Sequence, residues 1–241
     1  MLRAAEGGLS PRVQIRRRGA LLELRVDGTL ASAQHVGGAA AGPVWDAIAA
    51  PILALPVERR RSILVLGLGG GTAIRAVRSF APEARIGVVE LDAGVAEAAT
   101  RHFGVGALGL EVVVDDARTF LVRDTGRYDM VIEDVFVGPN RRIGKPEGFP
   151  EPLATHALAR LAPGGLLVSN TIHEHAATAR AWLTHVPRVV SIAVDGYYNH
   201  VLVAGPTTLT ARVLRRAFSS EPRLRRTLTR LAFRTLRSDL V

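Results

Sequence analysis

Apolar residues recur along this chain with two alternating periods, which predict strands and helices in turn. Ile63–Leu66 is an apolar run of strand length, as expected for a strand that is buried on both faces. Residues 73–80 then repeat apolar side chains at helical spacing, and Pro82 ends that helix. Ile86–Val89 is the next apolar run. This order favours a mostly parallel sheet with helices on both faces.

The alternation continues to residue 205. Further strands are predicted at residues 13–15, 21–26, 30–32, 110–114, 128–132, 166–169, 189–194 and 200–204. Helices are predicted at residues 44–55, 95–102, 153–161 and 174–183. The pair Asp27-Gly28 lies between two of the first strands and is a good hairpin signal. We therefore expect an α/β fold with a doubly wound, mostly parallel, seven-stranded sheet, preceded by a small β-strand region.

The length of 241 residues suits one substantial domain with small additions. We expect three parts: a small β-strand region at 1–43, an α/β domain at 44–206, and a basic helical tail at 207–241. In the tail, helices are predicted over Ala211–Phe218 and Leu224–Leu236. The leucines of the second helix form an apolar stripe, which needs a surface to pack on.

The formal net charge is +9, and Lys145 is the single lysine among 31 basic residues. The tail holds nine arginines against Glu221 and Asp239, so the remainder of the chain is nearly neutral. We therefore do not expect nucleic acid as the partner of the α/β domain. For the tail, a solvated or partner-facing surface is favoured, and binding to nucleic acid or another acidic surface is the alternative.

Cysteine is absent, which excludes disulfides and thiolate chemistry. The sequence has no apolar span of about 18 residues, and residues 1–20 lack the apolar core of a signal peptide. We therefore expect no membrane contact and a cytoplasmic location. A homodimer stays open as an alternative.

A glycine-rich turn separates the strand at 63–66 from the helix that follows it, and consists of Gly67, Gly69, Gly70 and Gly71 with Leu68 between. Glycines let the backbone approach a ligand closely, and the helix that opens at Thr72 offers unpaired N–H groups. Glu90 ends the next strand, about 20 residues downstream, where a carboxylate can accept hydrogen bonds from two ribose hydroxyls. The pattern predicts nucleotide or nucleoside binding, and a tight packing turn is the alternative.

Three acidic residues each follow a predicted strand: Glu90, Asp116 and Asp134. In doubly wound sheets, ligands bind beyond the carboxyl ends of the strands. We therefore expect these three carboxylates to meet at one edge of the sheet and to form a ligand site.

Five segments resemble successive motifs of class I S-adenosylmethionine-dependent transferases: VLGLGGG, VVELD, VVVDDARTFL, YDMVIEDVF and LAPGGLLVSN. More narrowly, they are similar to the spermidine-synthase-like branch. The segment LELRVDGTLAS resembles the small β-strand domain that precedes the cofactor domain there. The resemblance covers roughly residues 13–205, and it is more specific for the fold than for the reaction.

By position, the resemblance implies a role for each matching residue. Glu90, with Leu91 beside it, would hold the ribose hydroxyls of S-adenosylmethionine, its decarboxylated form or methylthioadenosine. Asp116 would accept from the adenine amino group, with Ala117 beside it. The glycine turn and Thr72 would lie under the cofactor. Asp134 would face the attacking amine of a small-molecule acceptor. We take it as the catalytic proton acceptor, with the capping of a turn as the alternative.

Three positions depart from the aminopropyltransferase pattern. An Asp, a Gln and a second Asp of that pattern are replaced here by Thr72, Ala31 and Val137. The two lost aspartates, at Thr72 and Val137, remove negative charge where a diamine needs it. A desolvated ammonium without a partner costs several kcal/mol. Methyl transfer is therefore preferred over aminopropyl transfer to a polyamine. A non-catalytic nucleoside-binding module is the alternative from a different class.

The remaining candidates carry a weaker signal. Trp45, Asp46, Tyr197 and Tyr198 are candidates for the substrate pocket, with hairpin packing as the alternative for the two tyrosines. Glu133 is expected to be structural. The segment His173-Glu174-His175 has alternating histidines without further ligands nearby in the sequence, so we expect a solvated helix start and no metal site.

Overall fold

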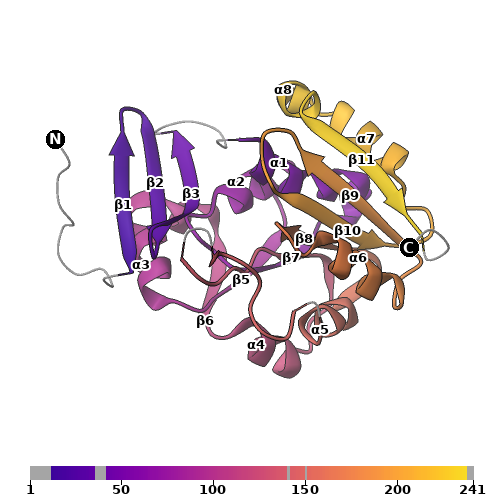
Figure 1. Cartoon of the computed structure of the whole chain (residues 1–241), viewed down its shortest axis with the longest axis horizontal. Helices are drawn as coiled ribbons and strands as arrows, with labels where there is room; N and C mark the ends of the chain where they lie inside the picture. Colours follow the sequence, from indigo (N-terminus) through magenta and orange to yellow (C-terminus); the bar gives the residue numbers. More distant parts are fainter. Residues whose placement is uncertain (1–11, 36–41, 140–141, 150, 238–241) are drawn as a thin grey trace.

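A computed structural model describes residues 12–35, 42–139, 142–149 and 151–237 (Figure 1). Its centre is one eight-stranded sheet, in which β4 to β8 run parallel and β9, β10 and β11 are antiparallel to their neighbours. The strand order is β11 (Leu231–Leu236), β9 (Arg188–Val194), β10 (His200–Gly205), β8 (Leu161–Thr171), β7 (Tyr128–Glu133), β4 (Ser62–Leu66), β5 (Arg85–Glu90) and β6 (Leu110–Val114). The predicted doubly wound fold is confirmed.

Helices cover both faces of this sheet because its strands are apolar on both sides. In β4, Ile63 and Val65 belong to one hydrophobic core, whereas Leu64 and Leu66 belong to the other. The first core contains side chains of α1 (Pro43–Ala49), α2 (Thr72–Phe80), α3 (Ala93–Phe103) and α7 (Ala211–Ser219). The second contains side chains of α4 (Ala117–Arg123), α5 (Leu153–Ala159) and α6 (His175–Leu183).

A separate three-stranded antiparallel sheet consists of β1 (Val13–Arg18), β2 (Leu21–Val26) and β3 (Thr29–His35), as Figure 1 shows in indigo. The predicted hairpin at Asp27-Gly28 is present, with φ of 49° and 78° at its two central residues. Positive φ at both positions gives the turn the twist that flanking strands require. The sheet contacts the central domain through α2 and α3.

The end of the chain differs from the predicted helix over Leu224–Leu236. A short helix α8 (Arg225–Leu228) is followed by strand β11, which pairs antiparallel with β9 (Figure 1, yellow). Burial alternates along β11, because Leu231 is buried while Ala232 and Arg234 are exposed. An open edge on β9 and this two-residue period outweigh the helical spacing of the leucines.

The prediction of seven strands is therefore one strand short, and the segment after residue 206 is not a purely helical tail. Its last strand is part of the central sheet. Within the described residues, no helix has both the length and the apolar character needed to cross a membrane.

Candidate functional site

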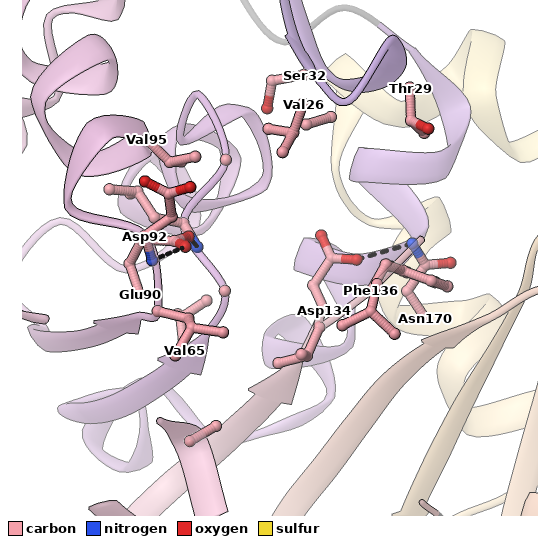
Figure 2. Close-up of a pocket in the computed structure, with 18 of the residues that line it drawn as sticks. Val26, Thr29, Ser32, Val65, Glu90, Asp92, Val95, Asp134, Phe136 and Asn170 are labelled. Carbon is pink, nitrogen blue, oxygen red and sulfur yellow. Dashed lines mark hydrogen bonds between the residues drawn. The ribbon is translucent and has the colours of Figure 1, made fainter. Parts of the chain in front are cut away.

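A cavity of about 680 Å³ opens at the carboxyl ends of the central strands, in the size range of small-molecule sites. It lies where β4 has β5 on one side and β7 on the other, the point at which the winding of the sheet reverses. Residues of the small sheet, Val26 and Ser32 among them, cover it from above (Figure 2). Glu90 and Asp92 lie at one end, and Asp134, Phe136 and Asn170 lie at the other (Figure 2).

The glycine turn passes closely under the cavity. Gly67 has a φ of 94°, and a Cβ there would lie 2.5 Å from the carbonyl oxygen of Asp134. A Cβ on Gly70 would lie 2.8 Å from Ser32, whose hydroxyl accepts the Gly70 N–H over 2.8 Å. The turn is thereby held between β7 and the small sheet, at distances that no larger residue allows.

Not every predicted residue of this turn reaches the cavity. Gly67 and Gly69 line it, whereas Gly70 and Gly71 do not, because they pack against the small sheet and Val105. Thr72 lines the cavity but is 1% exposed, and its hydroxyl donates to the carbonyl of Ala33 over 3.1 Å.

Glu90 organises the first end of the cavity. Its two carboxylate oxygens accept the backbone N–H groups of Leu68, over 2.9 Å, and of Asp92, over 3.0 Å. Each oxygen has further acceptor capacity, and the side chain lines the cavity. Leu91 also lines it and is 64% exposed, which leaves a large apolar side chain at the mouth.

Asp116 and Ala117 line the same end of the cavity at the start of α4. Asp116 caps this helix by accepting the N–H groups of Arg118, over 3.1 Å, and Thr119, over 2.9 Å. The backbone hydrogen bond from Thr119 is the main reason that the pKa of Asp116 is lowered. Asp116 is therefore a carboxylate at neutral pH. Glu90 and Asp116 are both predicted site residues, and the structure places them along one cavity.

Asp134 directly follows β7 and lies at the other end of the cavity. Its Oδ1 accepts from Nδ2 of Asn170 over 2.8 Å, and Oδ1 of Asn170 accepts from Nδ2 of Asn199 over 2.9 Å. Burial raises the pKa of Asp134, while the hydrogen bond from Asn170 and the charge of Lys145 act in the opposite direction. A carboxylate with a raised pKa beside a cavity suits proton transfer.

Asn170 and Asn199 both line the cavity. Sequence reasoning missed Asn170, whereas Asn199 belongs to the same hairpin segment as the candidates Tyr197 and Tyr198. Asn170 is the last residue of the motif LAPGGLLVSN, and Asn199 immediately precedes β10. Their position at strand ends was the available signal. That they face Asp134 depends on the pairing of β8 with β7 and with β10.

Two of the four predicted pocket residues are corrected by the structure. Trp45 and Tyr197 line the cavity, but Asp46 and Tyr198 do not. Asp46 lies on α1 and accepts a hydrogen bond from the hydroxyl of Thr227, which packs the last part of the chain against that helix. Burial raises the pKa of Asp46. Tyr198 is 81% exposed.

Comparison with known proteins agrees with this architecture. The sequence model of the spermine/spermidine synthase domain matches residues 49–222, which is most of the chain, so the chain belongs to this family. The probable polyamine aminopropyl transferase of Bifidobacterium longum is 30% identical over 132 residues, which is 54% of this chain and 28% of that protein. The chain spans less than two fifths of the length of the curated relatives it matches.

Two solved structures share the fold. A probable spermidine synthase from Corynebacterium glutamicum superimposes with a TM-score of 0.73 and 23% identity, over 94% of this chain and 88% of that one. Human methyltransferase-like protein 13, in complex with SAH, gives a TM-score of 0.62 and 22% identity, over 78% of this chain and 93% of that one.

Proposed function

We propose that this member of the spermine/spermidine synthase family binds S-adenosylmethionine or a close relative and transfers an alkyl group, preferably methyl, to a small nucleophile. The observation that carries the proposal is the division of one cavity into two ends. Glu90 lies at one end and Asp134 at the other (Figure 2). Asp116 lies beside Glu90, because it follows β6, which pairs with β5. A donor and an acceptor can therefore lie side by side in the cavity.

The first end suits a nucleoside. Glu90 offers carboxylate oxygens that the backbone already orients, and such a carboxylate is the usual partner of ribose hydroxyls. Asp116 and Ala117 lie where an adenine amino group would be accepted, and Leu91 offers an apolar surface to the base. Gly67 and Gly69 leave room for the backbone to approach the ligand. The complex of human methyltransferase-like protein 13 with SAH supports the same ligand class for this chain.

The second end suits deprotonation of a nucleophile. S-adenosylmethionine supplies an alkyl carbon bonded to a positively charged sulfur. The sulfur is the leaving group, and it needs no acid catalyst because it leaves as a neutral thioether. Asp134 accepts the proton that the attacking nitrogen or oxygen loses, while Asn170 holds the carboxylate in one orientation. The bond from nucleophile to carbon forms as the carbon–sulfur bond breaks, and the electron pair of the broken bond stays on sulfur.

Methyl transfer is preferred because the acids of an aminopropyltransferase are missing. The hydroxyl of Thr72 donates a hydrogen bond to the carbonyl oxygen of Ala33. Ala31 has no polar side-chain group, and Val137 presents an apolar side chain to the cavity. Among the described residues that line the second end, Asp134 is then the acid that a cationic acceptor can contact. Aminopropyl transfer to a polyamine remains the alternative within the family, and a nucleoside-binding module without catalysis is the alternative outside it.

Calorimetric titration with S-adenosylmethionine, decarboxylated S-adenosylmethionine and methylthioadenosine tests this proposal. We expect binding of S-adenosylmethionine, and product formation when small amines or hydroxyl compounds are added. Tight binding of the decarboxylated form with putrescine as an efficient acceptor would favour aminopropyl transfer. Binding of the nucleosides without turnover over a broad acceptor set would favour the non-catalytic module, and absence of binding would contradict the site.

A further inference from the structure

The only lysine of the chain, Lys145, is buried, and its charge acts on Asp134 at the second end of the cavity. Its side chain and that of Glu133 are each 2% exposed. The ammonium donates to both carboxylate oxygens of Glu133, over 2.7 and 2.8 Å, and to the carbonyl of Val135 over 3.1 Å. These three bonds use all three hydrogens of the ammonium group.

Lys145 also connects parts of the chain that are far apart in sequence. Its ammonium lies 4.1 Å from the ring centroid of Phe136 and 5.0 Å from that of Phe149. Its backbone N–H donates to Glu174, at the start of α6, over 3.2 Å. Glu133 in turn accepts from the hydroxyl of Ser169 on β8. Lys145 thus contacts the end of β7, the start of α6 and two aromatic rings directly, and is linked to β8 through Glu133.

The residues on either side of this lysine form a wall of the cavity. We call Phe136, Val137, Ile143 and Pro146 the acceptor wall, because they line the cavity near Asp134. Lys145 and Glu133 do not line it themselves. The acceptor wall belongs to no helix or named strand, and its internal backbone pairing is the bridge between Val137 and Gly144. Its shape therefore depends on side-chain contacts more than a helix or strand would.

We infer that Lys145 is a positioning residue that holds the acceptor wall against Asp134, by pairing with Glu133 and by contacting Phe136. The inference rests on the proposed function, because it assigns the wall to the acceptor. A buried ammonium without its carboxylate is strongly unfavourable, so loss of either partner should release the loop that carries the wall. Within the described part of the chain, no hydrogen bond or ion pair joins Glu90 to Lys145 or Glu133.

Acylation of Lys145 by an amine-directed reagent, followed by mass spectrometry, measures how firmly it is held. In the intact protein we expect Lys145 to react at least about tenfold more slowly than in urea-unfolded protein, because the reaction needs local opening. In Glu133→Gln the rate should rise about tenfold towards the unfolded value. Glu151→Gln is the matched control, because Glu151 forms an exposed ion pair with His185. In this variant the acylation rate of Lys145 should stay at the wild-type value.

Two results would overturn the inference: Lys145 in folded Glu133→Gln as protected as in wild type, or Lys145 in wild type as reactive as in unfolded protein. If Glu133→Gln fails to fold, Ser169→Ala can replace it, because it removes one hydrogen-bond partner of Glu133. The acylation rate of Lys145 should then rise by a smaller factor. An unchanged rate would contradict the inference. Kinetic measurements on the acceptor distinguish a positioning role of Lys145 from a purely structural one. Lys145→Arg should retain more acceptor kcat/KM than Lys145→Met, and both should bind methylthioadenosine as wild type does.

Parallel loss of nucleoside affinity and acceptor kcat/KM in Lys145→Met would assign the lysine to general stability and contradict a positioning role. If no nucleoside binds to any form, the proposed function fails. The acylation rates would then still decide whether the Lys145–Glu133 pair holds the loop.

Discussion

Asn170 donates a side-chain hydrogen bond to Asp134 across 2.8 Å, from the end of β8 to the end of the neighbouring strand β7. Asn170 is only 6% exposed, and its amide oxygen is held in turn by Asn199. Its amide group therefore has one orientation, with the NH₂ toward the carboxylate. This contact favours the ionised form of Asp134, whose pKa is raised by burial.

The first prediction is that Asn170→Ala moves the activity of the enzyme to higher pH. The proposed reaction requires ionised Asp134, so kcat/KM should rise as the pH passes the pKa of this group. The hydrogen bond from Asn170 lowers the pKa of Asp134, so its loss should leave the effect of burial less opposed and raise that pKa further. The acidic limb of a kcat/KM profile should shift upward by the same amount. Asn199→Ala should shift it less, and an unmoved limb in Asn170→Ala would show that Asp134 is not the base.

The second prediction concerns Glu90. Glu90→Ala should weaken the binding of S-adenosylmethionine by about 2–3 kcal/mol, because a charge-assisted contact to ribose is lost. Isothermal titration calorimetry measures this loss. Glu111→Ala is a suitable control, because Glu111 lies on the neighbouring strand β6, outside the cavity lining, with an exposed side chain near Arg85. Equal affinity in both variants would remove Glu90 from the site.

The third prediction is that putrescine is a poor acceptor for this protein, and that one substitution improves it. Val137 lines the cavity and is 43% exposed, so an aspartate at this position can keep its charge partly hydrated. Val137→Asp should raise kcat/KM for putrescine about tenfold, as expected for one added partner of an ammonium group. Val137→Asn has the same size without the charge and should give no increase. Efficient use of putrescine by the wild-type chain would instead favour aminopropyl transfer over methyl transfer as its reaction.

The fourth prediction concerns the strand at the end of the described chain. Leu231 is 6% exposed on β11, so Leu231→Ala should lower the free energy of unfolding by about 2–5 kcal/mol. Arg234→Ala, at an exposed position of the same strand, should change it by less than about 0.5 kcal/mol. Urea denaturation compares the two. Equal effects would mean that β11 does not pack onto the sheet as described.

β11 also bears on the cavity through the β9–β10 hairpin. Arg230, just before β11, donates to the carbonyl of Asp195, and its guanidinium lies 5.5 Å from the ring centroid of Tyr197. Tyr197 and Asn199 of this hairpin line the cavity. The residue before the last strand therefore contacts the hairpin that lines the second end of the cavity. The predicted helical tail did not include this contact.

Local signals in the sequence were enough to predict the centre of the fold. The step from Ile63–Leu66 through the glycine turn to Glu90 has its period, its turn residues and its terminal acid within one short stretch. The hairpin at Asp27-Gly28 is equally local, because two adjacent residues determine the turn. Strand ends placed Glu90, Asp116 and Asp134 at one edge of a parallel sheet, and the cavity contains all three.

Tertiary structure decided everything that depends on which segments become neighbours. The leucines before residue 237 fit a helix by spacing, and only the open edge of β9 makes Leu231–Leu236 a strand. Asp46 and Trp45 are adjacent in sequence, yet Trp45 faces the cavity while Asp46 meets Thr227 from the end of the chain. Lys145 contacts Glu133 and Asn170 contacts Asp134, although the two pairs lie 12 and 36 residues apart in sequence. Periodicity along a chain reports which face of an element is apolar, but it carries no information about the partner that this face or the end of a strand will meet.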